Sequence, residues 1–249
     1  MTSRSAARRL AGRVGLAVAC GAALAVAASA AAPPAEVNPP RAEVVGTSAQ
    51  GRPILLYRLG APTAPRRVLV VGCIHGDECA AFPVIGRLIR MPPPPGVELW
   101  VVPSVNPDGR ALGTRGNAHG VDLNRNFPFS WHRIPRPSRY YSGPRPLSEP
   151  ESRTVRELVL RARPRVSIWF HQPERNVRDP DASPSARRYA RLAGLPFLPL
   201  AAPPGTVAQW TKRKVSGAEA FAVELAPGPM DPGGVGRHVR AVRAVAAGR

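Results

Sequence analysis

One stretch of the chain places a buried strand, a polar turn and a helix in direct succession. Residues 68–71 (VLVV) form a short, β-branched apolar run, which predicts a buried strand. Apolar residues recur at helical spacing in residues 78–90, and Pro83 limits where that helix can begin. The turn between them is residues 73–78 (CIHGDE). This order predicts an α/β domain, in which ligands bind at the edge where the strands end.

His75 and Glu78 are the residues of this turn that can hold a metal ion. Three positions apart, at the end of a strand, they can direct one imidazole and one carboxylate at the same ion. The same residues also fit a solvated helix start, where Asp77 and Glu78 suit the helix dipole. The pair alone leaves both interpretations open.

The N-terminal residues have the layout of a secretory signal peptide. Four arginines and no acid precede an uncharged apolar segment of about fifteen residues, which is short for a membrane span. Residues 28–30 (ASA) then offer a cleavage site between small residues. We expect residues 1–30 to direct export, so that the protein is secreted or associated with the cell wall. The alternatives are a lipoprotein cysteine at Cys20 or an N-terminal membrane anchor; no later stretch is long and apolar enough to span a bilayer.

The rest of the chain predicts a short leader and one domain. Residues 31–43 are rich in Ala and Pro, whereas residues 44–249 are long enough for a single domain with a sizeable core. The charge is strongly positive, with 35 Lys and Arg against 16 Asp and Glu. The basic residues are scattered and accompany no nucleic-acid motif, so we expect an anionic cell wall or an acidic substrate as the partner, not nucleic acid.

Two cysteines, Cys73 and Cys79, flank the His/Glu turn. Export would permit a disulfide between them. A bridge that closes so short a loop must meet strict geometry, however. We therefore expect two buried thiols.

A second polar region follows the strand predicted over residues 97–102. Residues 106–109 (NPDG) have turn chemistry, and polar side chains follow among glycines in residues 114–117 (TRGN) and 121–128 (VDLNRNFP). Arginine presents a planar fork that matches a carboxylate, and asparagine can add a second donor. This density after the end of a strand predicts an anion-binding site.

Two further candidates lie at predicted strands late in the chain. His171 ends the apolar run 166–170, and a catalytic zinc site commonly adds such a distant ligand to two that are close in sequence. Its alternative is a histidine that merely ends a strand. Glu224 lies within the apolar run 220–225, where a carboxylate is costly without a partner. It is either a catalytic base or the partner of an arginine.

These motifs together resemble the M14 zinc carboxypeptidase family, in particular the small bacterial branch that includes the murein peptide amidases. The resemblance is carried by residues 75–78 (HGDE), 106–109 (NPDG) and 122–127 (DLNRNF), with a further similar segment at 140–151. It implies a single α/β domain whose mixed, mostly parallel sheet is flanked by helices.

The resemblance also implies one zinc ion, held by His75, Glu78 and His171. Asp122 would orient His75, as carboxylates commonly do for ligating imidazoles. The resemblance thus implies a metal-binding role for the His/Glu turn, which the turn alone leaves open.

Four residues would act on the substrate if the resemblance holds. Asn124 and Arg125 would bind its terminal carboxylate, and Arg115 would stabilise the oxyanion. Glu224 would take the proton from the attacking water and pass it to the leaving amine. The substrate would be a peptide with a free carboxylate, either a cell-wall stem peptide cut beside diaminopimelate or an ordinary protein C-terminus.

Two other activities use the same motifs. One is a zinc deacylase of the succinylglutamate desuccinylase/aspartoacylase type, and the other is a non-catalytic wall-binding protein on the same fold. Export and the complete set of ligands favour the peptidase.

The larger family members place a tyrosine in a loop that covers the substrate, and this chain shows no counterpart. We expect Trp210 to line the pocket instead, and residues 212–214 (KRK) either to bind an extra acidic group or to be surface charge. We also expect a helix over residues 149–161 with Ser148 as its cap, and a final helix over residues 235–247 with a solvated His238.

Overall fold

The computed structural model describes residues 42–248, so the predicted signal peptide and almost all of the leader lie outside the described residues. The strands are β1 (Ala42–Thr47), β2 (Pro53–Leu59), β3 (Arg66–Val71), β4 (Val97–Val102), β5 (Val166–His171), β6 (Asn176–Arg178), β7 (Phe197–Leu198) and β8 (Glu219–Glu224). The α-helices are α1 (Phe82–Ile89), α2 (Pro107–Leu112), α3 (Pro150–Ala162), α4 (Pro184–Ala193), α5 (Val207–Lys214) and α6 (Pro232–Ala246), and Leu123–Arg125 form one 3₁₀ turn. None of these helices is long and apolar enough to cross a membrane.

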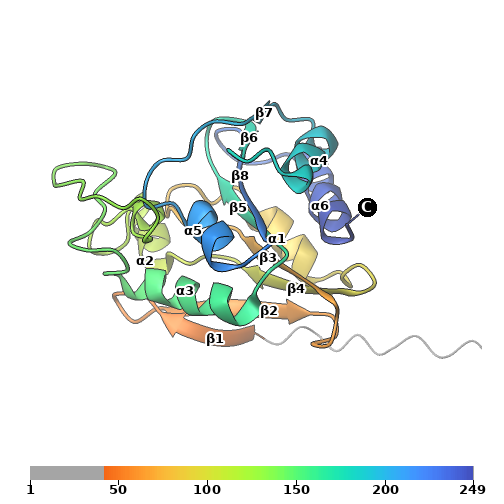
Figure 1. Ribbon diagram of the computed structural model, residues 1–249, viewed down its shortest axis with the longest axis horizontal. Helices are drawn as coiled ribbons and strands as arrows, with labels where there is room; N and C mark the ends of the chain where they lie inside the picture. Colours follow the sequence, from red (N-terminus) through yellow and green to blue (C-terminus); the bar gives the residue numbers. More distant parts are fainter. Residues whose placement is uncertain (1–41, 249) are drawn as a thin grey trace, which may run out of the picture. The chain divides into compact units, whose positions relative to one another are not determined.

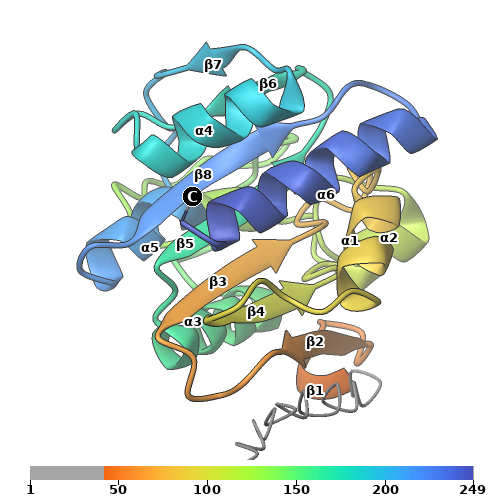
Figure 2. The ribbon, with the colours of Figure 1, turned by 90° about the vertical axis from the view of Figure 1, so that its right-hand side faces the viewer.

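All eight strands form one sheet, in the order β1-β2-β4-β3-β5-β8-β6-β7. The central strands β4, β3, β5 and β8 run parallel, and β7 runs parallel to β6. The antiparallel pairs are β1 with β2, β2 with β4, and β6 with β8. Helices α1, α4 and α6 cover one face of the sheet, and α3 and α5 cover the other (Figures 1 and 2). The predicted mixed, mostly parallel sheet between helices is confirmed.

The central strand β3 shows why the sequence forms this layered sheet. Val68 and Val70 pack on the side of α1 and α6, and Leu69 and Val71 pack on the side of α3. Successive side chains of a strand point to opposite faces, so a strand covered on both sides needs a continuous apolar run. The polar turn that follows is therefore delivered to the edge of the sheet.

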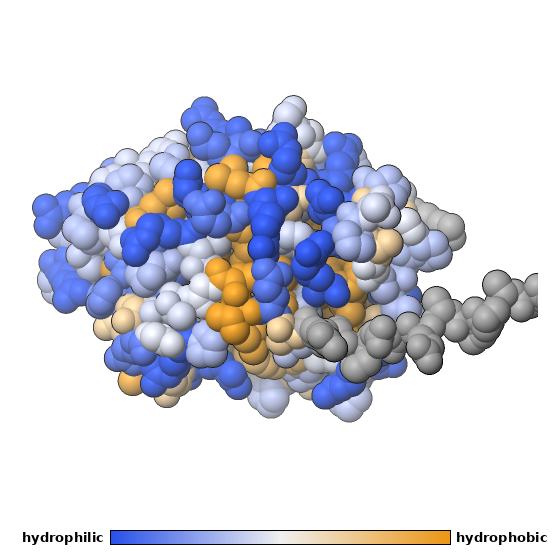
Figure 3. Space-filling view, turned by 90° about the horizontal axis from the view of Figure 1, so that it is seen from below, coloured by the Kyte–Doolittle hydropathy of each residue, from blue (hydrophilic) through white to orange (hydrophobic). Residues whose placement is uncertain are grey.

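β1 is the outer strand, and only one of its faces is covered. Val45 packs against the cluster under α3, whereas Val44 points to the opposite face and is 61% exposed. Figure 3 views the molecule from this side and shows an apolar patch among hydrophilic side chains. Exposed apolar side chains are ordinary on the surface of a folded protein.

The predicted cap of α3 is wrong, although the helix itself lies within one residue of its expected range. Glu149 occupies the N-cap position and makes no side-chain cap hydrogen bond. The Ser148 hydroxyl instead donates to Glu149 Oε1 at 2.6 Å and accepts from Asn126 Nδ2 at 3.0 Å. These two contacts use the hydroxyl that a cap would need.

The prediction that His238 is solvated is also wrong. Its side chain faces α4, the residue is only 6% exposed, and Nδ1 lies 2.8 Å from the Tyr189 hydroxyl. Burial, together with the charge of Arg237, lowers the pKa of His238 to about 4. The Arg-rich sequence around His238 predicts an exposed position, but the contact between α4 and α6 buries it.

Candidate active site

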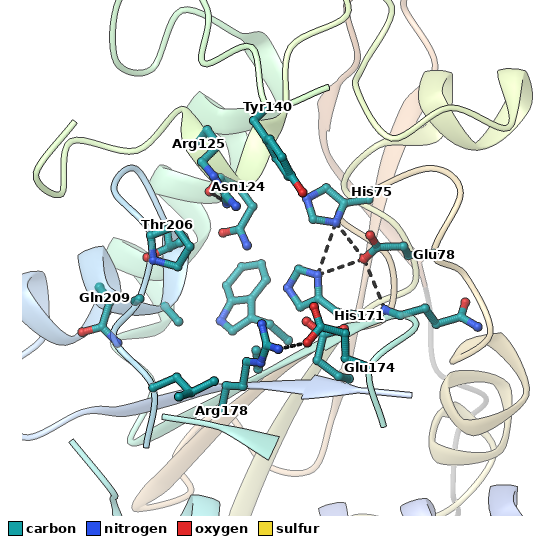
Figure 4. Close-up of a pocket in the computed structure, with 18 of the residues that line it drawn as sticks. His75, Glu78, Asn124, Arg125, Tyr140, His171, Glu174, Arg178, Thr206 and Gln209 are labelled. Atoms are coloured by element: carbon teal, nitrogen blue, oxygen red, sulfur yellow. Dashed lines mark hydrogen bonds and ion pairs between the residues drawn. The ribbon is translucent and has the colours of Figure 1, made fainter. Parts of the chain in front are cut away.

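The predicted metal ligands and the predicted base meet at the carboxyl edge of the parallel strands (Figure 4). His75 follows β3, His171 ends β5 and Glu224 ends β8. β5 and β8 are in register, with His171 opposite Glu224. Parallel strands end at the same edge of a sheet, which is the usual ligand-binding edge of such folds.

His75, Glu78 and His171 form a buried cluster of metal-binding groups. Their donor atoms all lie within 4.8 Å of one another. Glu78 Oε2 is 2.8 Å from His75 Nδ1 and 3.1 Å from His171 Nδ1, and the two ring nitrogens are 3.3 Å apart. Two imidazoles and one carboxylate are a ligand set of catalytic zinc. The residues present therefore fit a zinc ion.

The local backbone brings this turn against α2. Residues 106–109, which have turn chemistry, open that helix, with Asn106 as its cap. The turn approaches so closely that a Cβ on Gly76 would collide with the backbone of Gly109 and Arg110. Glycine at this position lets the turn hold its neighbours His75 and Glu78 toward the site.

Asp122 fixes the other side of the His75 ring. Its Oδ1 lies 3.0 Å from His75 Nε2, and its Oδ2 accepts from Arg115 Nε at 3.0 Å. Burial would raise the pKa of Asp122, but the charges of His75 and Arg115 hold that pKa well below its usual range. An ionised Asp122 accepts the proton of Nε2, which leaves the Nδ1 lone pair for a metal.

Glu78 is held as a carboxylate in the same way. Burial would raise its pKa, but its close contacts with the His171 and His75 rings outweigh burial and keep the pKa far below its usual range. Its second oxygen accepts from Arg115 Nη1 at 2.6 Å. A deprotonated carboxylate is the form that binds a metal.

The cluster opens into a cleft of about 370 Å³, here called the active-site cleft. Asn124 and Arg125 line it, as does Arg115. Asn124 Oδ1 accepts from Val207 N at 3.0 Å, so the amide nitrogen of Asn124 is the group that can donate to a ligand. The cleft thus brings the predicted carboxylate-binding residues and the metal cluster into one cavity.

Glu224 also lines the active-site cleft, and its Oε2 is buried without a hydrogen-bond partner. Within residues 42–248 it forms no ion pair. The alternative of a structural salt bridge to an arginine is therefore wrong. An unpaired carboxylate oxygen at this position is free to accept a proton.

Sequence reasoning missed Tyr140 as a residue of the site. It lines the active-site cleft, and the guanidinium groups of Arg115 and Arg125 each lie 5.2 Å from its ring centroid. Cation–π contacts of this kind hold both arginines in place. The segment around Tyr140 carries part of the family resemblance, but nothing in its pattern shows that the ring reaches the cleft.

The expectation that Trp210 lines the pocket is wrong. Trp210 is buried against Phe127, with ring centroids 5.4 Å apart, while its neighbour Gln209 lines the cleft. Successive residues of a helix point in different directions, so α5 directs only one of the two to the site. Of residues 212–214, Lys212 is paired with acids of this chain, since its ammonium lies 2.8 Å from Asp179 and 2.5 Å from Asp181.

The expectation of two thiols at the metal turn is wrong as well. Cys73 and Cys79 form a disulfide. The turn brings their Cα atoms to 5.1 Å, inside the range that a disulfide requires. The bridge encloses His75 and Glu78 in one closed loop.

Comparisons with known proteins identify the family of this chain. The model of the family Peptidase_M14, zinc carboxypeptidase, matches residues 96–178. Murein peptide amidase A of Escherichia coli (strain K12) is 33% identical over 187 residues, which cover 69% of this chain and 76% of that protein. Carboxypeptidase B of Astacus astacus is 29% identical over 160 residues, covering 52% and 53% of the two chains.

A solved structure extends the similarity to the whole domain. The murein-tripeptide amidase of Escherichia coli O157 superposes with a TM-score of 0.71 at 28% identity, covering 84% of this chain and 92% of that one. Its match and the sequence relatives agree on the fold and on the class of enzyme. The chain therefore belongs to the M14 zinc carboxypeptidase family and is a hydrolase of the metallopeptidase or amidase type.

Proposed function

We propose that this protein hydrolyses the amide bond next to a free carboxylate in a cell-wall peptide. One observation carries the proposal: the unpaired Oε2 of Glu224 shares a cleft with the His75, Glu78 and His171 cluster and with Arg125. A base, a metal site and a cation for the substrate carboxylate are the three parts that such a hydrolysis needs.

The metal ligands and Glu224 have different roles in this hydrolysis. A zinc ion held by His75, Glu78 and His171 would polarise the scissile carbonyl and acidify water. Glu224 accepts a proton from the attacking water at Oε2 and passes it to the leaving amine.

Three other residues bind the substrate carboxylate and stabilise the negative charge that develops during the reaction. Arg125 and the amide nitrogen of Asn124 bind the carboxylate beside the scissile bond. Arg115 donates to the oxygen on which negative charge develops. Its present hydrogen bonds to Glu78 and Asp122 hold the guanidinium at the edge of the cleft.

The substrate is proposed from the relatives and from the charge of the chain. Two of the relatives named above, both from Escherichia coli, are by their names amidases of murein peptides. The chain has 35 basic and 16 acidic residues, and this excess of positive charge favours association with an anionic wall. We propose that residues 1–30 direct export and that the substrate is a stem peptide containing diaminopimelate.

The first test measures the zinc content and the hydrolytic activity of the same protein. The purified protein is analysed for zinc and assayed, with and without a chelator, on a stem tripeptide ending in diaminopimelate, on an ordinary C-terminal peptide and on an N-acyl amino acid. About one zinc per chain and chelator-sensitive cleavage of the tripeptide are expected. Faster cleavage of either other compound would replace the wall-peptide substrate with that class.

Glu224→Gln tests the base separately from the metal. The variant should bind zinc normally and lose about 10²- to 10⁴-fold in kcat, because general-base catalysis contributes that much. Glu157→Gln, which changes an exposed carboxylate on α3, is the matched control. A near-normal rate for Glu224→Gln would remove Glu224 from this role.

A further inference from the structure

The sheet face that carries Glu224 also carries Arg178. β6 pairs antiparallel with β8, with Asn176 opposite Glu224 and Arg178 opposite Ala222. Directly opposed residues, and residues two apart in one strand, lie on the same face of a sheet. Glu224 and Arg178 therefore project into the same cleft, which both residues line.

A small residue borders the space between these two side chains. Ala208, Ala201 and Thr206 also line the cleft, and the buried Thr206 hydroxyl has no hydrogen-bond partner. Ala222 lies between Glu224 and Arg178 on their common sheet face. A substrate side chain can enter this region, here called the alanine recess, and its end would meet Arg178.

Arg178 is oriented by a buried neighbour. Its Nε donates to Asn176 Oδ1 at 3.1 Å, and Asn176 Nδ2 in turn donates to the carbonyl of Glu174 at 3.1 Å. Asn176 is buried, so this contact fixes the plane of the guanidinium. This contact leaves the terminal N–H groups of Arg178 for Glu174 and for a ligand.

The only acidic partner of Arg178 within residues 42–248 is Glu174, and the two side chains point toward each other in Figure 4. The side chain of Arg178 is 31% exposed and that of Glu174 is 49% exposed. An ion pair this open to water contributes little. A carboxylate of a bound ligand can therefore share or replace Glu174 on the guanidinium fork.

The cleft thus offers two separate places for negative charge. In Figure 4, Arg125 and Asn124 lie in the upper part of the cleft and Arg178 in the lower part, with the metal cluster to the right of both. The main-chain carboxylate of a substrate occupies only one of them. The second place, at Arg178, is left for a negative charge on another part of the ligand.

We propose that Arg178 selects substrates whose carboxy-terminal residue carries a carboxylate in its side chain. This rests on the proposed function, in which Arg125 and Asn124 bind the main-chain carboxylate. Glu174 beside Arg178 adds an acceptor for an ammonium group on the same side chain. An acidic side chain would use Arg178 alone, and a side chain ending in both groups, as in diaminopimelate, would use the pair.

The test compares four tripeptides that differ only in the last residue. Diaminopimelate carries a side-chain carboxylate and ammonium, 2-aminopimelate the carboxylate only, lysine the ammonium only and norleucine neither. The wild-type kcat/KM should favour the two carboxylate peptides over norleucine by about 10- to 100-fold, the range of a hydrogen-bonded charge. In Arg178→Met this ratio should fall by at least about tenfold, and Arg178→Lys should restore part of it.

Two further variants separate the roles of the pair. Glu174→Gln should slow cleavage of the diaminopimelate peptide relative to the 2-aminopimelate peptide. Arg156→Met on α3 removes one exposed positive charge and should leave every ratio unchanged, which controls for the net charge. Calorimetric binding of the four peptides to the Glu224→Gln protein should give the same order of affinity without turnover.

The outcomes distinguish this inference from the proposed function. Equal rates on all four peptides, or an equal loss on all four in Arg178→Met, would overturn the role of Arg178 and leave the hydrolase proposal standing. No cleavage by zinc-loaded protein would overturn the hydrolysis proposal, and the order of binding affinities would then decide the role of Arg178 alone.

Discussion

His75 Nε2 lies 3.0 Å from Asp122 Oδ1, although the two residues are 47 positions apart in the chain. Both side chains are almost completely buried, so no water competes for this hydrogen bond. The contact sets which ring nitrogen of His75 carries the proton and turns Nδ1 toward Glu78 and His171. The metal site therefore depends on a carboxylate that is not itself part of the ligand cluster.

Asp122→Asn should weaken zinc binding by about 10- to 100-fold, the usual effect of losing such a partner. The amide cannot supply the charge that now favours the His75 orientation. Competition with a coloured chelator measures the affinity. Asp181→Asn, at an exposed acid on another loop, is the control and should bind zinc like wild type. Equal affinities in both variants would show that Asp122 does not support His75.

Arg125→Met should lower kcat/KM for a peptide with a free carboxylate by about 10- to 100-fold, because a hydrogen bond to a charged group is lost. The loss should be much smaller for the same peptide with an amidated end. Steady-state kinetics on the two peptides provide the measurement, and Arg240→Met on the exposed side of α6 is the control. If both peptides lose equally, Arg125 does not bind the carboxylate.

Replacing both Cys73 and Cys79 by serine should lower the free energy of unfolding by about 2 kcal/mol, as expected for so short a loop. Denaturant unfolding of the wild type with and without a dithiol reductant measures the same quantity. The reductant should destabilise the wild type and leave the double variant unchanged. Equal stability under all conditions would mean that the disulfide adds nothing to the fold.

His238 should make the protein less stable in mild acid. Its pKa is about 4 in the folded protein and near the ordinary histidine value of 6.5 when unfolded. Between these pH values His238 is protonated in the unfolded chain but neutral in the folded chain. Its contribution to the free energy of unfolding is therefore fully present above about pH 6.5 and is lost as the pH falls toward 4. The loss attributable to this residue is about 3 kcal/mol.

Unfolding midpoints of wild type and His238→Gln at pH 7 and pH 5 test this contribution. The variant will be less stable at pH 7, since it loses the contact with the Tyr189 hydroxyl. Its stability should change less than that of the wild type between the two pH values. An identical pH dependence would exclude His238 as the source.

Local patterns in the sequence determined the framework of the site. The apolar run of β3, the polar turn after it and the helix α1 follow from periodicity and from Pro83. The runs that end in His171 and Glu224 follow in the same way. Because parallel strands end at one edge, residues that follow such runs meet there, however far apart they are in the chain.

Only the tertiary structure decided what surrounds these residues. It buried His238 between two helices, turned Trp210 away from the cleft and paired Lys212 with acids from another loop. It joined Cys73 to Cys79 and placed Arg178 on the same sheet face as Glu224. A sequence pattern shows which side chains can be buried or charged, but the neighbours that pack against them come from distant segments, and those neighbours determine burial, pairing and direction.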